Sequence, residues 1–345
     1  MRSPAVRAIA LFTLAACGGG GLGSSSADGG AEDGAARSGD GGAADASFGP
    51  ARPADPPGAE TYDYVIGWIR LAEARGDEAA GFDLDGHVTT RGPVGAPGCG
   101  KPDFTAPARF GGTAGVDNQL TPILGQIREL NPDVDLSADL MDSVLEGEII
   151  VLLRLAEVGD LVDDGRVVVT LFVGRPAGGG VPATEEIEIA GETVTALAPD
   201  QAFVIDPEAT YLDGDPSMPR YVFPDAYLRE GRLYTAATNF SLRAPATEGR
   251  EFALDFRARV SGEVSPTRME NALIGGSSTV SELLSTVASL ESPAIEEAGE
   301  ETVRAIIEAQ ADIRTDETLP TCDALSLALE LRAVRAEIRT RVEAP

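Results

Sequence analysis

The segment Glu251–Val264, EFALDFRARVSGEV, alternates apolar side chains with charged or small ones. In an extended strand successive side chains point to opposite faces, so a two-residue period separates an apolar face from a polar face. The apolar face is formed by Phe252, Leu254, Phe256, Ala258 and Val260. Such a strand belongs to an antiparallel sheet that has one face on a core and one face in water. The chain is therefore expected to fold around such a sheet.

Other segments rich in β-branched and aromatic residues repeat this signal along the chain. Strands are expected over 62–72, 148–158, 166–174, 184–190, 201–205, 220–223 and 231–243. The last segment, 322–342, has the composition of a helix, but its leucines alternate between Leu325 and Leu331, which favours a strand.

Helical spacing of apolar residues predicts helices over 118–130, 137–145, 280–290 and 303–313. Thr279 and Glu282 form a capping-box pattern at the start of the third helix. No internal repeat or second linker interrupts residues 61–345. We therefore expect one globular domain there, of the α+β, β-rich class: an antiparallel β-sandwich-like fold with a few packed helices.

The N-terminus has a short basic start, MRSPAVR, a short apolar stretch, and then Leu14-Ala15-Ala16-Cys17. This pattern resembles the lipobox of bacterial lipoproteins. The resemblance implies a signal peptide over 1–16, lipidation of Cys17 with fatty acids such as palmitate, and attachment to a membrane through that lipid. Residue 18 is Gly rather than Asp, which by the same resemblance implies the outer membrane of a Gram-negative cell envelope. The alternative is an ordinary secretory signal followed by an unrelated cysteine.

Gly, Ala, Ser and Pro supply 32 of the 43 positions from 18 to 60. Only Leu22 and Phe48 are large apolar side chains in this segment, so it has too little apolar surface to form a core. We expect residues 17–60 to be the lipidated cysteine and a disordered linker.

The chain carries 27 Lys and Arg residues against 56 Asp and Glu residues, a formal net charge of −29. A surface this acidic repels the phosphates of nucleic acids and of anionic lipids, which excludes nucleic acid as a partner. It favours divalent cations, and it leaves an unidentified protein or glycan as the expected partner.

Two cysteines remain when Cys17 is lipidated, namely Cys99 and Cys322. An even pair in an exported protein predicts a disulfide, because the compartments outside the cytoplasm are oxidising. This disulfide would tie the loop over 81–120 to the last strand. The alternative is two free, buried thiols.

The loop over 81–120 holds the single histidine, His87, and begins with the acidic motif GFDLDG. Calcium prefers oxygen ligands from carboxylates, amides and carbonyls, which an irregular loop can supply. The candidate ligands are Asp83, Asp85, Asp103, Asp117 and Asn118. An EF-hand would need a third acid or amide where His87 stands, so the motif departs from that pattern. The alternative is that these acids cap turns and the start of the helix near Asn118.

No pattern of catalytic residues stands out. One histidine and a paired cysteine do not make a zinc site, and no G-x-S-x-G motif accompanies His87. The GGSS segment at 275–278 lacks the lysine of a phosphate-binding loop. The motifs GFDLDG, GVDNQL and CDALSLALELRAV resemble a pattern in uncharacterised envelope lipoproteins of GC-rich Gram-negative bacteria, which implies a shared fold and no particular activity.

These observations favour a membrane-anchored envelope lipoprotein that acts as a binding or structural module, stabilised by calcium, rather than an enzyme. One alternative is an exported hydrolase that uses two carboxylates on a glycan or peptide. Another is an envelope assembly factor, which would expose a large apolar groove.

Overall fold

A computed structural model describes residues 49–93, 97–130, 135–245, 251–289 and 299–340. The expected signal peptide over 1–16 and the expected lipidation site Cys17 lie outside these residues. Within the described ranges, no helix is long and apolar enough to cross a membrane.

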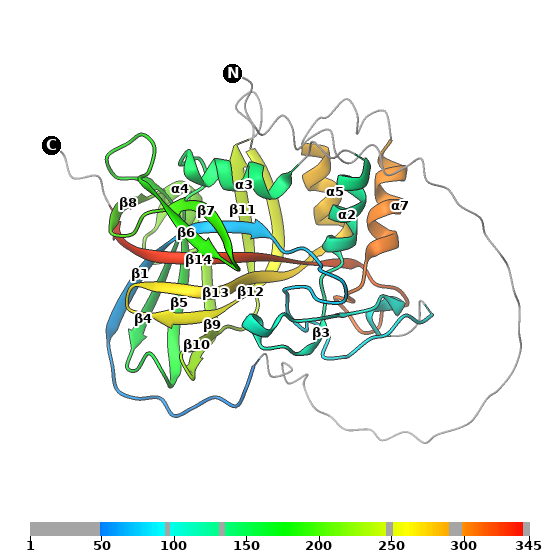
Figure 1. Ribbon diagram of the computed structural model, residues 1–345, viewed down its shortest axis with the longest axis horizontal. Coiled ribbons are helices and arrows are strands. Elements are labelled where there is room, and N and C mark those ends of the chain that lie inside the picture. The colour runs from blue at the N-terminus through cyan, green and yellow to red at the C-terminus, as the bar shows by residue number, and fades with distance from the viewer. Residues whose placement is uncertain (1–48, 94–96, 131–134, 246–250, 290–298, 341–345) are drawn as a thin grey trace, which may run out of the picture.

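An eight-stranded antiparallel barrel forms the larger part of the structure (Figure 1). Each strand pairs with the next in the order β1, β4, β5, β9, β10, β12, β13 and β14, and β14 pairs with β1 to close the ring. The strands are β1 (Glu60–Leu71), β4 (Val151–Val158), β5 (Asp164–Pro176), β9 (Tyr221–Arg229), β10 (Arg232–Tyr234), β12 (Glu251–Ser265), β13 (Arg268–Thr279) and β14 (Ala324–Arg339).

The prediction of a β-rich antiparallel fold is confirmed, but the β-sandwich is wrong. A sandwich and a barrel both need strands with one apolar face, so alternation along a single strand does not distinguish the two. The pairing of β1 with β14 distinguishes them, because it joins the first strand of the sheet to its last. Closure leaves these eight strands without a free sheet edge.

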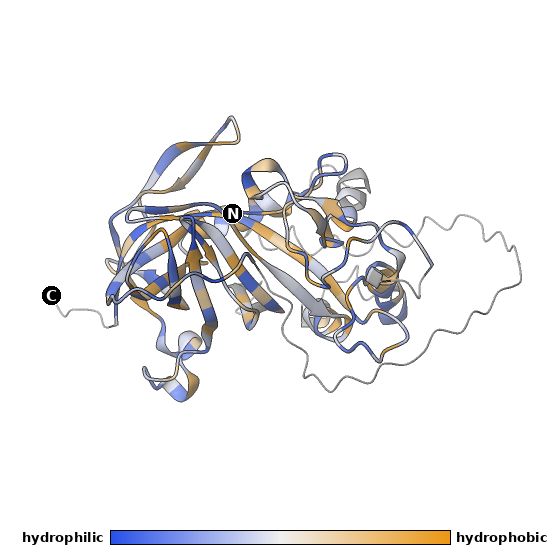
Figure 2. Ribbon diagram, turned by 90° about the horizontal axis from the view of Figure 1, so that it is seen from below, coloured by the Kyte–Doolittle hydropathy of each residue, from blue (hydrophilic) through white to orange (hydrophobic). Residues whose placement is uncertain are grey.

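Apolar side chains fill the barrel. Its fully buried residues include Tyr64, Leu153, Phe223 and Leu233, each from a different strand. The Tyr64 hydroxyl donates to the backbone carbonyl of Ser265, so the phenol is buried with its polar atom paired. Figure 2 shows hydrophobic and hydrophilic residues interleaved along the barrel strands. The interior is therefore a packed core.

Additional strands border the barrel. β8 (Gln201–Ile205) pairs with β5 and with β14, and β11 (Thr238–Pro245) pairs with β12. β6 (Thr184–Ile189) and β7 (Glu192–Leu197) form a separate hairpin. All of these except β7 overlap a predicted strand.

The helices are α2 (Leu120–Leu130), α3 (Leu136–Leu145), α4 (Pro207–Thr210), α5 (Val280–Ser289) and α7 (Glu300–Gln310). They lie in two places: α2, α5 and α7 are at one end of the molecule, and α3 and α4 lie against the barrel strands β1 and β5 (Figure 1). The predicted capping box forms: Thr279 N–H donates to Glu282, and Glu282 N–H donates to Thr279 Oγ1. α5 and α7 pack together through a small core of their own.

β14 is buried on both faces over most of its length. Leu327, Leu329 and Leu331 point into the barrel core. The opposite face carries Ser326, Ala328 and Glu330, and residues from 72–93 and 97–119 cover it. We call residues 72–93 and 97–119 the loop layer; it includes the short strands β2 (Phe104–Thr105) and β3 (Ala114–Val116).

The predicted linker over 17–60 extends too far toward the C-terminus, because residues 49–59 are not a free linker but lie against the barrel. Tyr227 donates its hydroxyl to the carbonyl of Pro50, and the Arg52 guanidinium donates to the carbonyl of Asp225. Gly165 N–H donates to the carbonyl of Ala54. The composition argument counted large apolar residues, whereas this segment is held by backbone hydrogen bonds and by one arginine.

A glycine in the barrel wall provides a test of the packing between strands. An added Cβ at Gly276 in β13 would lie 1.7 Å from the carbonyl oxygen of Arg257 in β12. We expect Gly276→Ala to destabilise the fold by about 1–3 kcal/mol, measured as a lower thermal midpoint, because the two strands must separate locally. Gly178→Ala is the matched control, since nothing lies within 4 Å of its added Cβ. Equal midpoints for the two variants would contradict this account of the β12–β13 contact.

Candidate metal centre

Asp83 and Asp117 are brought together by a short antiparallel bridge inside the loop layer. Phe82 pairs with Asp117, and the Asp117 N–H donates to the carbonyl of Phe82 at 2.9 Å. The Leu84 N–H then donates to Asp117 Oδ2 at 2.7 Å. Two acids that are far apart in the sequence therefore lie side by side.

The GFDLDG motif folds into two consecutive turns, each capped by its own aspartate. Gly86 N–H donates to Asp83 Oδ1 at 2.7 Å, and His87 N–H donates to Asp85 Oδ1 at 2.8 Å. Gly86 has a φ of 76°, a left-handed conformation that glycine adopts without strain. The capping interpretation therefore holds for Asp83 and Asp85, but it uses only one oxygen of each carboxylate.

One oxygen each from Asp83, Asp85 and Asp117 lies within 4.8 Å of the other two. We call these three residues the acid cluster. Asp83 is exposed, Asp85 is half-buried and Asp117 is 1 % exposed, so the cluster extends from the surface into the interior. Three carboxylates this close together repel one another unless a proton or a cation lies among them.

The buried side of the cluster has unsatisfied oxygen atoms. Asp117 Oδ1 is inaccessible to solvent and has no hydrogen-bond partner, and the same is true of Asn118 Oδ1. The Asn118 amide donates to the carbonyl of Ala80, which fixes the orientation of its side chain. A buried carboxylate oxygen without a partner costs free energy, and a bound cation would supply the missing interaction. The residues present therefore fit a cation.

Asp103 lies beside the acid cluster and outside the set of three. It accepts the Thr89 N–H, and its charge adds to the negative potential at Asp117. Of the five predicted ligands, the structure thus brings Asp83, Asp85 and Asp117 together and places Asp103 next to them. Asn118 follows Asp117 directly; its carboxamide is buried, and it does not cap the helix α2.

Sequence reasoning missed a further acid, Asp312, which lies two residues after the end of α7. Asp312 is 2 % exposed and accepts hydrogen bonds from the backbone and hydroxyl of Ser326 in β14. Its charge adds to the negative potential at Asp117. Nothing near Asp312 in the sequence marks it as part of a site, because the contact depends on the pairing of remote segments.

The pKa values of these carboxyl groups reflect their burial and mutual repulsion. Burial, with the charge of Asp312, raises the pKa of Asp117 to about 9. Burial also raises the pKa of Asp312 to about 7 and that of Asp103 to about 6. The pKa of Asp83 is raised, again mainly by burial. A divalent cation that binds at this site has to displace these protons, so its binding depends on pH.

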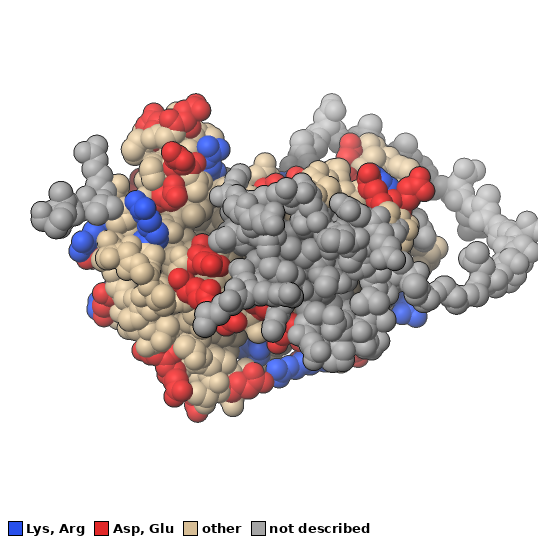
Figure 3. All heavy atoms as spheres, turned by 90° about the horizontal axis from the view of Figure 1, so that it is seen from above, with Lys and Arg blue, Asp and Glu red and all other residues tan. Residues whose placement is uncertain are grey.

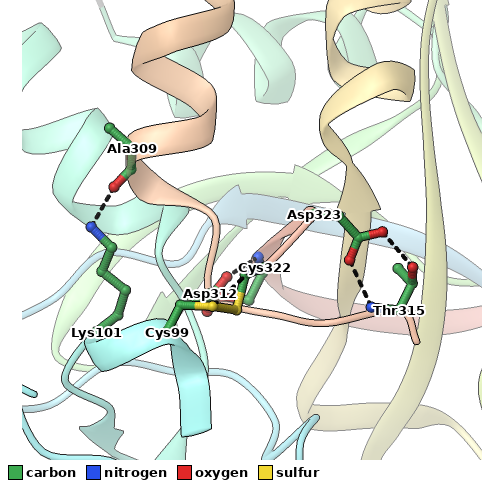
Figure 4. The surroundings of a disulfide bond; sticks show 8 residues. Cys99, Lys101, Ala309, Asp312, Thr315, Cys322 and Asp323 are labelled. Carbon is green, nitrogen blue, oxygen red and sulfur yellow. Dashed lines mark hydrogen bonds between the residues drawn. A yellow bond between two sulfur atoms is a disulfide. The ribbon is translucent and has the colours of Figure 1, made fainter. Parts of the chain in front are cut away.

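The predicted pair Cys99 and Cys322 forms a disulfide, with the two sulfur atoms 2.06 Å apart (Figure 4). The bond ties the loop layer to the segment that enters β14. Nearby, the Lys101 ammonium donates to the carbonyl of Ala309 at the end of α7. Positive charge there complements the negative end of the helix dipole.

A pocket of about 630 Å³ lies beside the disulfide. Its lining includes the two cysteines, Lys101, and the acids Glu308 and Asp323. None of the predicted metal ligands lines it. The pocket lies between the loop layer, the helices α5 and α7 and the segment before β14, and it is separate from the acid cluster.

The comparisons with known proteins found no matching family model, no matching curated protein and no matching solved structure. The resemblance of the body to envelope lipoproteins therefore stays a prediction. The function of the chain has to be inferred from its sequence and from the geometry of the site.

The raised pKa values predict that stability in metal-free buffer falls as pH increases. Asp103, Asp117 and Asp312 keep their protons in the folded state well above the pKa of an unfolded aspartate, about 3.9. Their stabilising contribution is complete below that value and is lost as pH rises through about 6 to 9. The measurement is the thermal midpoint between pH 5 and pH 9. Asp117→Asn, which cannot ionise, should flatten this dependence; identical slopes would show that Asp117 does not titrate in this range.

Proposed function

We propose that this chain is a lipid-anchored lipoprotein of a bacterial cell envelope, and that its barrel domain is a binding or structural module built around a calcium site. The observation that carries the calcium site is Asp117 Oδ1, a buried carboxylate oxygen without a hydrogen-bond partner, in a side chain that lies against Asp83 and Asp85. The observation that carries the anchor is the sequence Leu14-Ala15-Ala16-Cys17.

The disulfide supports export. Cys99 is 7 % exposed and joins a residue that is remote in the sequence. Such structural disulfides persist in oxidising compartments and are rare in the reducing cytosol. The acidic surface also fits a protein that is bathed in divalent cations. Figure 3 shows Asp and Glu side chains in several groups on one face of the molecule, with fewer Lys and Arg.

Calcium is the cation that the donor set favours. The available donors are carboxylate oxygens on irregular backbone, which are hard ligands in a flexible arrangement. Zinc would favour nitrogen or sulfur, and the single histidine, His87, is exposed while both cysteines of the body are joined in the disulfide.

The hydrolase alternative has weaker support. It needs two carboxylates that face each other across a substrate cleft. In the pocket beside the disulfide, Asp323 accepts hydrogen bonds from Thr315 and Glu308 forms an ion pair with Arg304. Both acids therefore have structural partners, which favours a binding or structural role over catalysis.

Calcium is expected to stabilise the protein through the acid cluster. At a calcium concentration about 100 times the dissociation constant, binding adds about 2.7 kcal/mol, which raises the thermal midpoint by several degrees. Asp85→Asn should abolish most of this increase, because the amide keeps the capping hydrogen bond to His87 and removes the charge. Thermal melts in millimolar calcium and in excess chelator, together with calcium titration calorimetry, provide the measurement.

Asp215→Asn is the matched control for that experiment. Asp215 caps an exposed turn by accepting the N–H of Ser217, in the same way that Asp85 accepts the N–H of His87, and it lies outside the acid cluster. We expect this variant to respond to calcium like the parent protein. An equal loss of response in both variants would indicate diffuse screening of the acidic surface rather than a site.

The anchor predicts a specific mass for the mature protein. Intact mass spectrometry of the membrane fraction should show a chain that begins at Cys17 and carries fatty acyl chains, since acyl chains hold a protein at a bilayer. Cys17→Ser should remove the acyl mass and leave the Cys99–Cys322 disulfide unchanged. An unmodified mature chain in the soluble fraction of the parent strain would contradict the anchor and favour an ordinary secretory signal.

A further inference from the structure

The disulfide between Cys99 and Cys322 borders a pocket that opens to solvent. Both cysteines line this pocket of about 630 Å³, together with exposed residues such as Ser281 and Thr321. Cys322 itself is half-buried. A pocket of this size has room for a small molecule or for a protruding turn of another protein. A thiolate has to reach one of the two sulfur atoms before it can exchange with a disulfide, and the pocket gives such access.

The backbone at Cys99 is in a conformation that favours glycine. Cys99 has a φ of 50° and a ψ of 31°, in the left-handed region that other residues seldom adopt. Gly98 and Gly100 on either side also have positive φ values, of 58° and 73°. A residue with a side chain keeps such a conformation only where its surroundings hold it, and the disulfide is the covalent restraint here. Breaking the disulfide would therefore allow the backbone at Cys99 to relax.

The two cysteines differ in what holds them. Cys322 packs on the small core of α5 and α7, and backbone hydrogen bonds to Ile313 and Val280 fix the next residue, Asp323. Cys99 belongs to the loop layer, and the backbone hydrogen bonds of the turn around it run within that layer. Loss of the disulfide would therefore release the loop layer at Cys99 and leave Cys322 in place.

The surroundings of the disulfide favour Cys99 as the leaving group. The backbone N–H of Cys322 donates to Cys99 Sγ at 2.8 Å, and a donor at this position stabilises a thiolate. Lys101, the single lysine of the chain, lines the same pocket and donates to the neutral carbonyl of Ala309 (Figure 4). This bond does not neutralise its charge, and a cation near a cysteine favours the thiolate. The two acids of the lining have an ion-pair partner and a hydrogen-bond partner of their own.

We propose that the Cys99–Cys322 disulfide is a thiol-exchange site, at which a dithiol releases the loop layer from the α5–α7 core. A thiolate of the dithiol attacks Cys322 Sγ, the bond between the two sulfur atoms breaks, and Cys99 leaves as a thiolate. The second thiolate of the dithiol then attacks the mixed disulfide, and Cys322 leaves as a thiolate. The dithiol is oxidised to a disulfide and the protein gains two electrons. The two protons lost by the dithiol balance those taken up by the cysteines. This proposal does not depend on the calcium site.

The first test measures whether the folded protein exchanges directly. The full chain is incubated with dithiothreitol, free thiols are trapped with iodoacetamide, and the labels on Cys99 and Cys322 are followed by peptide mass spectrometry. We expect the rate to be proportional to the dithiothreitol concentration and to stay nearly constant when urea is added below the unfolding transition. A rate that rises with urea in parallel with the unfolding equilibrium would overturn the proposal, since reduction would then need global unfolding.

A second dithiol distinguishes the source of the reductant. Reduced thioredoxin presents its two thiols on a protein surface, whereas dithiothreitol presents them on a small molecule. Reduction by both reagents at urea-independent rates supports a protein dithiol as the partner, and reduction by dithiothreitol alone supports a small one. If neither reagent reduces the folded protein, the exchange site is wrong and the disulfide is purely structural.

The second test follows the release of the loop layer by hydrogen exchange. The amides of Gly92 and Lys101 donate within the turn around Cys99, so we expect them to exchange several-fold faster in the reduced protein. The amide of Asp323 serves as the internal control and should not change. The variant Cys99→Ala with Cys322→Ala should show the same increase without any reductant. Unchanged exchange at Lys101 in the reduced protein would show that the layer stays in place, which contradicts the release step.

Discussion

The pairing of β14 with both β1 and β13 is the constraint on which the rest of the structure depends. On its inner face β14 contributes the leucines that close the core of the barrel. On its outer face it presents small and polar residues to which the loop layer attaches. Glu330 is only 4 % exposed and forms ion pairs with Arg70 of β1 and Arg109 of the loop layer. One buried carboxylate therefore links the barrel wall to the loop layer. A buried Glu330 carboxylate without a cationic partner would destabilise the folded state, so the two arginines are needed for the stability of the fold.

The contact between the loop layer and β14 combines a small apolar cluster with a buried polar network, and the polar network explains why a site can form there. Ser326 accepts the N–H of Gln119 and donates to Asp312. Asp312 and Asp117 then place two buried carboxyl groups near each other. An apolar interface would hold the layer without such groups. A polar interface must satisfy every buried atom, and Asp117 Oδ1 is an atom that protein partners leave unsatisfied.

Much of the secondary structure could be predicted from the sequence, because it depends on local patterns. The alternation in 251–264 and the Thr279–Glu282 capping box identify β12 and the start of α5. Barrel closure could not be predicted, since it depends on which strands pair and not on any one strand. The same limit applies to the acid cluster. The GFDLDG motif can be recognised in the sequence, but the pairing of Phe82 with Asp117 and the proximity of Asp312 to Asp117 are tertiary contacts.

The disulfide and a cation at the acid cluster would stabilise the loop layer in physically different ways. The Cys99–Cys322 disulfide is covalent and joins the layer to the segment before β14. A cation at the acid cluster would join the GFDLDG turns to Asp117 within the layer and depend on calcium concentration. The entropic cost of closing a loop grows only slowly with its length, so both ties can contribute despite very different sequence separations. The Arg259 guanidinium also donates to the carbonyl of Asp83, which links the turns to the barrel wall. Calcium at this position would therefore stiffen the part of the surface that the barrel and the disulfide already hold in place.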